Sequence, residues 1–209
     1  MNLQPLARRL SRLTTDIVVR RPRLWFLLRG LTRFQFGRLA PQWDAIRAGD
    51  TAYAPYEAAL ERVDPPKRAL DLGTGTGGAA FLIAQRFPGA EVIGADLAGQ
   101  MIAQARGKLT DDLAGRVRFE VADAAHLPYG GESFDLVGLS NMIPFFDELE
   151  RVLAPGGSLI VAFSGGADTP IYVPQERLRE ELTRRGFTDF AEFSTDPGTA
   201  LLARKAEHA

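Results

Sequence analysis

The spacing of apolar residues changes near Lys67, and the chain after this point alternates between strand and helix patterns. Short apolar runs predict strands over residues 68–72, 91–96, 117–121, 134–139, 158–163, 187–193 and 199–204. The stretches between them predict helices over residues 79–86, 100–108, 147–153 and 175–185. This alternation favours a doubly wound, mostly parallel α/β sheet with helices on both faces. Because no helix separates the last two strands, a C-terminal antiparallel hairpin should complete a seven-stranded sheet.

The residues before Lys67 show helical periodicity instead. A first helix should bury one apolar face, formed by Leu3, Leu6, Leu10, Leu13 and Ile17. Pro22 favours the start of a second helix, whose apolar side would be formed by Leu24, Leu27, Leu28 and Leu31. We therefore expect two units, an amphipathic helical arm and lid over residues 1–60 and a ligand-binding domain over residues 61–209.

Charge is distributed unevenly between these units. The net charge of the chain is −1, yet residues 1–40 contain nine arginines and a single acidic residue, Asp16. Such a basic amphipathic arm suits an anionic membrane surface, so residues 1–38 are a candidate membrane-binding segment. A helix pair that covers a soluble ligand or forms a dimer explains the pattern equally well. The acidic remainder of the chain makes nucleic acid an unfavourable partner.

The chain contains no cysteine and two histidines, His126 and His208. The absence of cysteine excludes disulfides and thiolate metal sites, and it fits a reducing, cytoplasmic compartment. Two histidines are too few for a typical histidine metal site, so we expect no metal.

Polar residues follow four of the predicted parallel strands, at the edge where sheets of this kind bind ligands. The first strand runs into D-L-G-T-G-T-G at residues 71–77, and the second ends at Asp96. Asp123 follows the third strand, and Ser140 and Asn141 follow the fourth. The glycine spacing by itself also fits a nicotinamide-dinucleotide loop. Such an oxidoreductase would usually carry a proton donor such as a Tyr-x-x-x-Lys pair, which this sequence lacks.

Five motifs in order resemble those of the class I S-adenosylmethionine-dependent methyltransferases, which have a Rossmann-like fold. The motifs are D-L-G-T-G-T-G at 71–77, Asp96 followed by Met101, A-D-A-x-x-L-P-Y at 122–129, F-D-L-V at 134–137 and R-V-L-A-P-G-G at 151–157. They lie within residues 66–205. Dinucleotide loops usually have an apolar residue in place of Asp71, and they require neither Asp123 nor the A-P-G-G turn.

The resemblance implies S-adenosylmethionine as the cofactor and suggests roles for individual residues. Asp71 would order its methionine end, and the glycines of residues 73–77 would leave room for the ligand. Asp96 would accept hydrogen bonds from the ribose hydroxyls, while Asp123 and the Ala124 amide would bind the adenine. The implied cofactor-binding set is Asp71, Gly73, Thr74, Gly75, Gly77, Asp96, Leu97, Met101, Asp123, Ala124, Ser140 and Asn141.

The resemblance also suggests the class of acceptor. Residues 36–44 resemble a stretch of small-molecule methyltransferases, including quinone and lipid ones, and Trp43, Tyr53 and Tyr56 are candidate lid residues. We therefore hypothesise methyl transfer to a small-molecule or lipid-like acceptor, such as a quinone or isoprenoid. Residues 140–146 lack the histidine that relatives often carry there, so no catalytic base is assigned. The alternative is a non-catalytic methyltransferase-fold module with an assembly or regulatory role.

Overall fold

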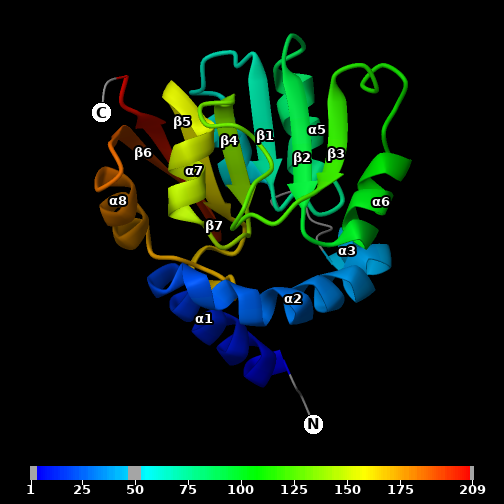
Figure 1. The fold of residues 1–209 in the computed structure, drawn as a ribbon, viewed down its shortest axis with the longest axis vertical. Coiled ribbons are helices and arrows are strands. Elements are labelled where there is room, and N and C mark those ends of the chain that lie inside the picture. The colour runs from blue at the N-terminus through cyan, green and yellow to red at the C-terminus, as the bar shows by residue number, and fades with distance from the viewer. Residues whose placement is uncertain (1–3, 47–52, 208–209) are drawn as a thin grey trace.

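The computed structural model describes residues 4–46 and 53–207, with side chains from Ser11 onward. Its centre is a seven-stranded sheet with the strand order β3-β2-β1-β4-β5-β7-β6 (Figure 1). The strands are β1 (Arg68–Leu72), β2 (Glu91–Asp96), β3 (Val117–Val121), β4 (Phe134–Ser140), β5 (Leu153–Phe163), β6 (Phe187–Thr195) and β7 (Gly198–Lys205). The helices are α1 (Gln4–Arg20), α2 (Trp25–Leu39), α3 (Trp43–Ile46), α4 (Ala54–Leu60), α5 (Gly78–Arg86), α6 (Gly99–Gly107), α7 (Phe146–Val152) and α8 (Gln175–Thr183).

The pairing of the strands confirms the predicted sheet. β1 pairs in parallel with β2 and β4, and β3 and β5 extend the parallel part on either side. β7 runs antiparallel to both β5 and β6, so the last two strands form the expected hairpin. β5 begins five residues before the predicted strand, at Leu153 rather than Ser158, because Leu153 already pairs with Phe134 across a shift in register.

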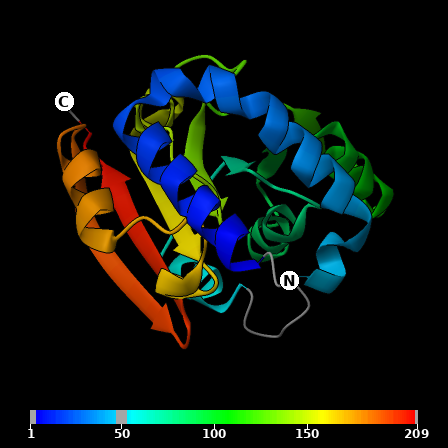
Figure 2. The same cartoon turned by 90° about the horizontal axis from the view of Figure 1, so that it is seen from below.

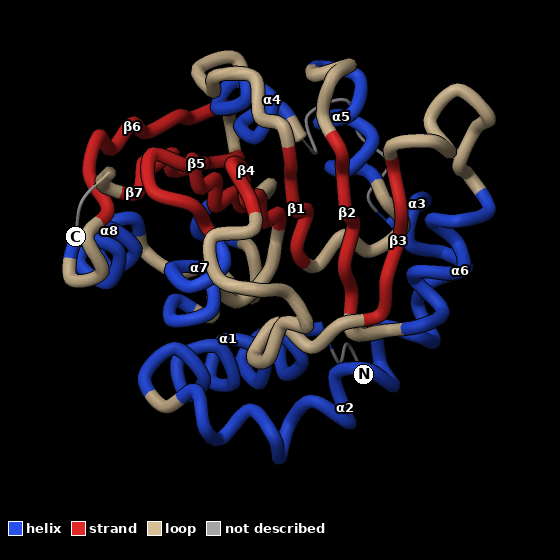
Figure 3. Tube along the Cα trace, turned by 45° about the horizontal axis from the view of Figure 1, so that its top comes forward, coloured by secondary structure: helices blue, strands red, loops and turns tan. Residues whose placement is uncertain are grey.

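Helices cover both faces of the sheet, and each face has its own apolar core. Figure 3 shows α4 and α5 on one side and α7 and α8 on the other. The first core contains Tyr56, Ile83 and Ile102 from α4, α5 and α6. The second core includes Leu149 of α7 and Leu178 of α8. Covering both faces in this way allows strands to be apolar along most of their length.

The arm forms the two predicted helices, which lie across the ends of the parallel strands (Figures 1 and 2). The short 3-10 turn η1 (Pro22–Leu24) joins α1 to α2, and a second turn, η2 (Ala40–Gln42), leads into α3. Among the described residues, no helix combines the length and apolar character needed to cross a membrane.

The expected apolar faces of the arm are partly wrong. Leu3 and the side chains of Leu6 and Leu10 lie outside the described residues. Val18 is buried in α1, whereas Leu13 is 57% exposed. In α2, Trp25 faces the domain, while Leu27 and Leu31 are 64% and 60% exposed. The inner face of α2 is therefore set by an aromatic residue that the leucine pattern did not include.

Candidate functional site

The glycine loop after β1 has the backbone that its sequence requires. Gly73, Gly75 and Gly77 have φ angles of +72°, +55° and +93°, a region that side chains with a Cβ rarely adopt. The amides of Gly73 and Thr74 donate to the Ala95 carbonyl at 2.8 and 3.0 Å, so the loop is fixed to the end of β2. The loop therefore lies at the edge of the sheet where the parallel strands end.

Asp96 at the end of β2 connects this loop to α6. Its Oδ2 atom accepts a hydrogen bond from the Gly75 amide at 2.9 Å, and Oδ1 accepts one from the Ala98 amide at 2.8 Å. Burial raises the pKa of Asp96, and the amides of Ala98, Gly75 and Leu97 oppose that rise only in part. Each carboxylate oxygen can accept a second bond, so Asp96 can still bind a diol.

Asp71 lies beneath the loop and is fully buried. The Thr74 hydroxyl donates to its Oδ2 atom at 2.5 Å. Thr74, which belongs to the sequence-based binding set, thus directs its hydroxyl toward the interior. This contact lets Asp71 act on a ligand through the shape of the loop, because a charge-assisted hydrogen bond holds Thr74 in place.

The turn after β3 presents Asp123, whose carboxylate contacts α2. The Trp25 indole N–H donates to Oδ1 at 2.8 Å, and the amide of Ala125 donates to the same atom at 3.0 Å. Arg29 lies 3.3 Å from Oδ2. Ala124 is buried beside this turn. Sequence reasoning missed Trp25 and Arg29, because the contacts join residues more than 90 positions apart.

Side chains also cover two of the loop glycines. A Cβ on Gly73 would lie 2.5 Å from the sulfur of Met142, and one on Gly75 would lie 3.0 Å from the indole nitrogen of Trp43. At Gly77 the corresponding space is filled by the core ring of Phe119, 2.9 Å away, so this glycine is packed against the interior. The room that Gly73 and Gly75 leave is thus on the side of the loop that the arm and the segment after β4 cover.

The remaining sequence-predicted residues surround this edge. Asn141 donates through Nδ2 to the Ser164 hydroxyl at 2.8 Å and accepts from the Ser164 amide at 2.9 Å, which joins the ends of β4 and β5. Ser140 is buried in the last position of β4. Met101 is buried in a small cluster with Ala40 of the arm. The structure therefore brings the twelve predicted residues to one edge, although several of their side chains serve packing.

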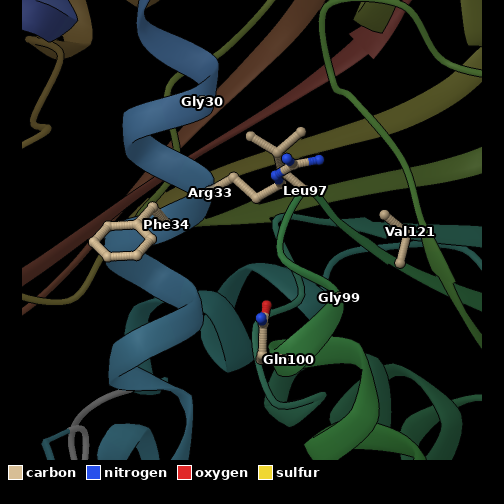
Figure 4. Close-up of a pocket in the computed structure, with 7 residues that line it drawn as sticks. All are labelled: Gly30, Arg33, Phe34, Leu97, Gly99, Gln100 and Val121. Atoms are coloured by element: carbon tan, nitrogen blue, oxygen red, sulfur yellow. The ribbon is translucent and has the colours of Figure 1, made fainter.

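A groove of about 550 Å³ separates the middle of α2 from the domain (Figure 4). Its lining includes Phe34 and Arg33 of α2, of which Arg33 extends toward Leu97, and Gln100 and Val121 of the domain. A cavity of this size is within the range that binds small ligands. Leu97 immediately follows Asp96, so the groove adjoins the carboxylate that can bind a diol.

The lid residues predicted from the sequence have different positions. Trp43 covers Gly75 as described, and Asp44 next to it accepts a hydrogen bond from the Thr76 hydroxyl at 2.6 Å. Lys108 pairs with Asp44 at 2.5 Å. The lid assignment of Tyr56 is wrong, because this side chain is fully buried in the core between α4 and the sheet. Tyr56 is buried because it packs closely against Gly138 of β4. The sequence pattern does not reveal this contact.

Other expectations concern residues beside the site. Tyr129 and Phe134 pack edge to face with ring centroids 5.1 Å apart, as expected for core residues. The Tyr129 hydroxyl donates to Glu120 at 3.0 Å, and burial together with this contact raises the pKa of Tyr129. His126 is exposed beyond the Asp123 turn.

The residues present fit S-adenosylmethionine in their chemistry. The loop offers left-handed glycines, Asp96 offers acceptors for a ribose diol, and Asp123 offers an acceptor for an amine. The donors and acceptors lie along one edge, as a ligand with an amino acid at one end and a purine at the other requires. The side chains that now lie over this edge come from the arm and from Met142.

Comparisons with known proteins place the chain in a family. A family model described as a methyltransferase domain matches residues 69–157. A demethylmenaquinone methyltransferase from Thermus thermophilus is 41% identical over 138 residues, covering 60% of this chain and 62% of that protein. The structure of an S-adenosylmethionine-dependent methyltransferase from Mesorhizobium loti aligns with a TM-score of 0.60 at 20% identity, over 75% of this chain and 99% of that chain.

The relatives differ in how much of their length this chain covers. The chain spans 62%, 57% and 60% of three curated relatives, two named demethylmenaquinone methyltransferase and one named ubiquinone/menaquinone biosynthesis C-methyltransferase, which is less than two thirds of their length. A malonyl-[acyl-carrier protein] O-methyltransferase from Geobacter sulfurreducens is 33% identical over 182 residues, 77% of this chain and 67% of that protein. This likeness extends over most of both chains and shows that the present chain belongs to the class I S-adenosylmethionine-dependent methyltransferase family.

Proposed function

We propose that this chain transfers a methyl group from S-adenosylmethionine to a small-molecule acceptor of the quinone or lipid-like class. The observation that carries the proposal is the contact between Asp96 and the Gly75 amide at 2.9 Å, which joins the two characteristic cofactor elements at one ligand edge. The acceptor class is supported by relatives named as demethylmenaquinone methyltransferases and as a ubiquinone/menaquinone biosynthesis C-methyltransferase.

The proposed roles follow from the geometry of the site. S-adenosylmethionine supplies an electrophilic methyl group on sulfur. Asp96 would accept the ribose hydroxyls with the lone pairs that the backbone amides leave, and Asp123 would accept the adenine amine. Asp71 would hold the loop in its ligand-binding shape through Thr74. Together these groups would fix the cofactor so that its methyl group faces the acceptor.

The segment after β4, which would border the acceptor, offers no group that could take up a proton. Its Met142 lies over Gly73 at the start of the loop, and Trp43 of the arm lies over Gly75 in the middle of the loop. Residues 141–146 contain no titratable side chain. This segment therefore supplies no general base, and the acceptor must be nucleophilic enough to react without one. The electron-rich ring of a quinol meets this requirement.

The arm, residues 1–60 in the proposed division, would bring the chain to such an acceptor. Phe26, Leu27 and Leu31 are 60–64% exposed on α2, with Arg33 also exposed on this helix and Arg23 exposed in the preceding turn η1. Exposed apolar side chains flanked by arginines match an anionic bilayer surface, where the apolar groups enter the interface and the arginines stay near the headgroups. We therefore propose a cytoplasmic protein that binds membranes peripherally through this arm.

Binding and turnover test the proposal separately. Calorimetry with S-adenosylmethionine and S-adenosylhomocysteine should show binding that Asp96→Ala abolishes. Asp64→Ala is the matched control, because Asp64 is an exposed acid whose side chain pairs with Arg204. The second assay measures transfer of a labelled methyl group to a short-chain demethylmenaquinone. The unmodified chain and Asp64→Ala should be active in it, and Asp96→Ala should not. Lack of cofactor binding would refute the proposal, and binding without transfer to quinone or lipid acceptors would favour the non-catalytic module.

A further inference from the structure

The surfaces that should receive the cofactor are covered by side chains of the same chain. Met142 lies over Gly73, Trp43 lies over Gly75, and Trp25 is hydrogen-bonded to Asp123. Two of these three covering residues belong to the arm. The contact of Trp25 with Asp123 is the most specific of the three. Its indole N–H donates to the carboxylate that would accept a hydrogen bond from the amine of a purine.

The bonding of Asp123 shows what Trp25 excludes. Oδ1 accepts from the Trp25 indole and from the Ala125 amide, at 2.8 and 3.0 Å, and these two bonds use both of its lone pairs. Oδ2 faces Arg29 at 3.3 Å. Like adenine, an indole has two fused planar rings and an N–H donor. The Trp25 ring is buried and packs edge to face on Phe145 with centroids 5.4 Å apart.

We propose that Trp25 is an internal latch, which takes the place of adenine at Asp123 and must leave before the cofactor can bind. The inference rests on the proposed function, because it assigns Asp123 to the adenine amine. In the latched state, Arg29 adds a weak ion pair to the same carboxylate, since its side chain is 53% exposed. Release of the latch frees Oδ2 of Asp123 and one of the two acceptor positions of Oδ1, while the Ala125 amide keeps the other.

The packing of α2 suits a helix that can be released. Of its fifteen residues, all of which the structure describes, Trp25 and Gly37 are buried. Gly37 packs closely on Gln100 near the other end of the helix, where a Cβ would lie 2.7 Å from the Gln100 side-chain oxygen. Between these two anchors Leu28 is partly buried against the core, and the groove of about 550 Å³ separates the part of α2 from Gly30 to Phe34 from the domain (Figure 4). Elements with few buried contacts open at low cost in free energy.

A latch lowers the apparent affinity for the cofactor by the fraction of molecules that are open. Trp25→Phe keeps a ring against Phe145 but removes the N–H donor, so it should raise the open fraction. A hydrogen bond to a charged group has an effect of roughly tenfold on such an equilibrium, so S-adenosylhomocysteine should bind roughly tenfold more tightly to this variant. Arg29→Ala should act in the same direction with a smaller effect.

Calorimetry with S-adenosylhomocysteine on the full chain tests the latch. Arg38→Ala is the control for Arg29→Ala, because Arg38 is also exposed on α2 and the structure gives it no contact with Asp123. The second readout is fluorescence in Trp43→Phe protein, in which Trp25 is the remaining tryptophan. Saturating S-adenosylhomocysteine should shift its emission to longer wavelength as the indole leaves its buried site.

The outcomes separate the latch from the function on which it rests. Tighter binding by Trp25→Phe, with the red shift in the single-tryptophan protein, supports the latch. Binding by the unmodified chain that Trp25→Phe weakens or leaves unchanged overturns the latch alone, as does unchanged Trp25 emission on saturation. No binding by any variant overturns the proposed function, and the latch with it.

Discussion

Met142 lies directly against Gly73: a Cβ placed on this glycine would stand 2.5 Å from the methionine sulfur. The segment after β4 thus touches the loop after β1, although the two are almost 70 positions apart in the sequence. The contact is possible because Gly73 lacks a side chain and has a φ angle of +72°. A side chain at position 73 would therefore both strain the backbone and displace Met142.

Gly73→Ala should reduce the affinity for S-adenosylhomocysteine at least tenfold. A side chain at positive φ strains the backbone by about 1–2 kcal/mol, and the new methyl group also displaces Met142 toward the ligand. Isothermal calorimetry measures the affinity, and urea denaturation measures the free energy of unfolding. Gly107→Ala is the control, since a Cβ there meets no atom within 4 Å. Equal affinities of the two variants would contradict the role of Gly73.

Cofactor binding should depend on pH through Asp96. Burial raises the pKa of this carboxyl above its ordinary value of 3.8, and ribose hydroxyls donate to the ionised form. Affinity for S-adenosylhomocysteine should therefore rise as pH rises through the pKa of Asp96. Without ligand, the folded state holds this proton more tightly than the unfolded state, so Asp96 lowers stability as pH rises from 3.8 through its folded pKa.

Asp96→Asn removes the titrating group and tests both trends. Calorimetric titrations at a series of pH values should give a flatter affinity profile for the variant, and denaturant unfolding should lose the corresponding pH slope. A profile for Asp96→Asn that parallels the unmodified chain would assign the dependence to another group.

The strand boundaries and the ligand edge could be predicted from the sequence for a physical reason. β1 and β2 have the predicted bounds, because buried parallel strands are apolar runs that end at glycine, proline or polar residues, and the edge strand β3, which alternates buried and partly exposed residues, has them too. Parallel strands also place their carboxyl ends together, so Asp96 and Asp123 had to lie near the glycine loop. These features depend on local pattern and on topology.

The inner face of α2 could not be predicted in the same way. Apolar residues occur on both sides of this helix, so periodicity does not show whether Trp25 or Leu27 faces the domain. The choice depends on Asp123, 98 positions away from Trp25. The burial of Tyr56 is of the same kind, because it depends on Gly138, where a Cβ would overlap the tyrosine hydroxyl.

Thr74→Val should destabilise the chain by about 1–3 kcal/mol, because it removes a hydrogen bond to a buried carboxylate. The Thr74 hydroxyl donates to Asp71 at 2.5 Å, and both residues are buried. Urea denaturation gives the free energy of unfolding. Thr32→Val is the control, since the Thr32 hydroxyl donates at 3.1 Å to the Leu28 carbonyl of its own helix. Similar losses in the two variants would show that Asp71 does not depend on Thr74.

The outer face of α2 should be needed for membrane binding. In vesicles that contain anionic lipid, the double variant Leu27→Ser, Leu31→Ser should bind at least tenfold more weakly in co-sedimentation. Each leucine loses on the order of 1 kcal/mol of apolar burial in the interface, given that both are more than half exposed on the protein. High salt should weaken binding of the unmodified chain, since it screens the arginines.

Ile46→Ser tests whether vesicle binding requires the outer face of α2 or only an exposed apolar residue anywhere on the surface. Ile46 is 56% exposed at the end of α3, outside α2, so its loss should leave vesicle binding unchanged. The double leucine variant should in turn keep its affinity for S-adenosylhomocysteine, because Trp25 and Arg29 contact Asp123 from the inner side of the helix. Equal binding to neutral and anionic vesicles, or equal losses in the two serine variants, would refute the membrane surface while leaving the cofactor site intact.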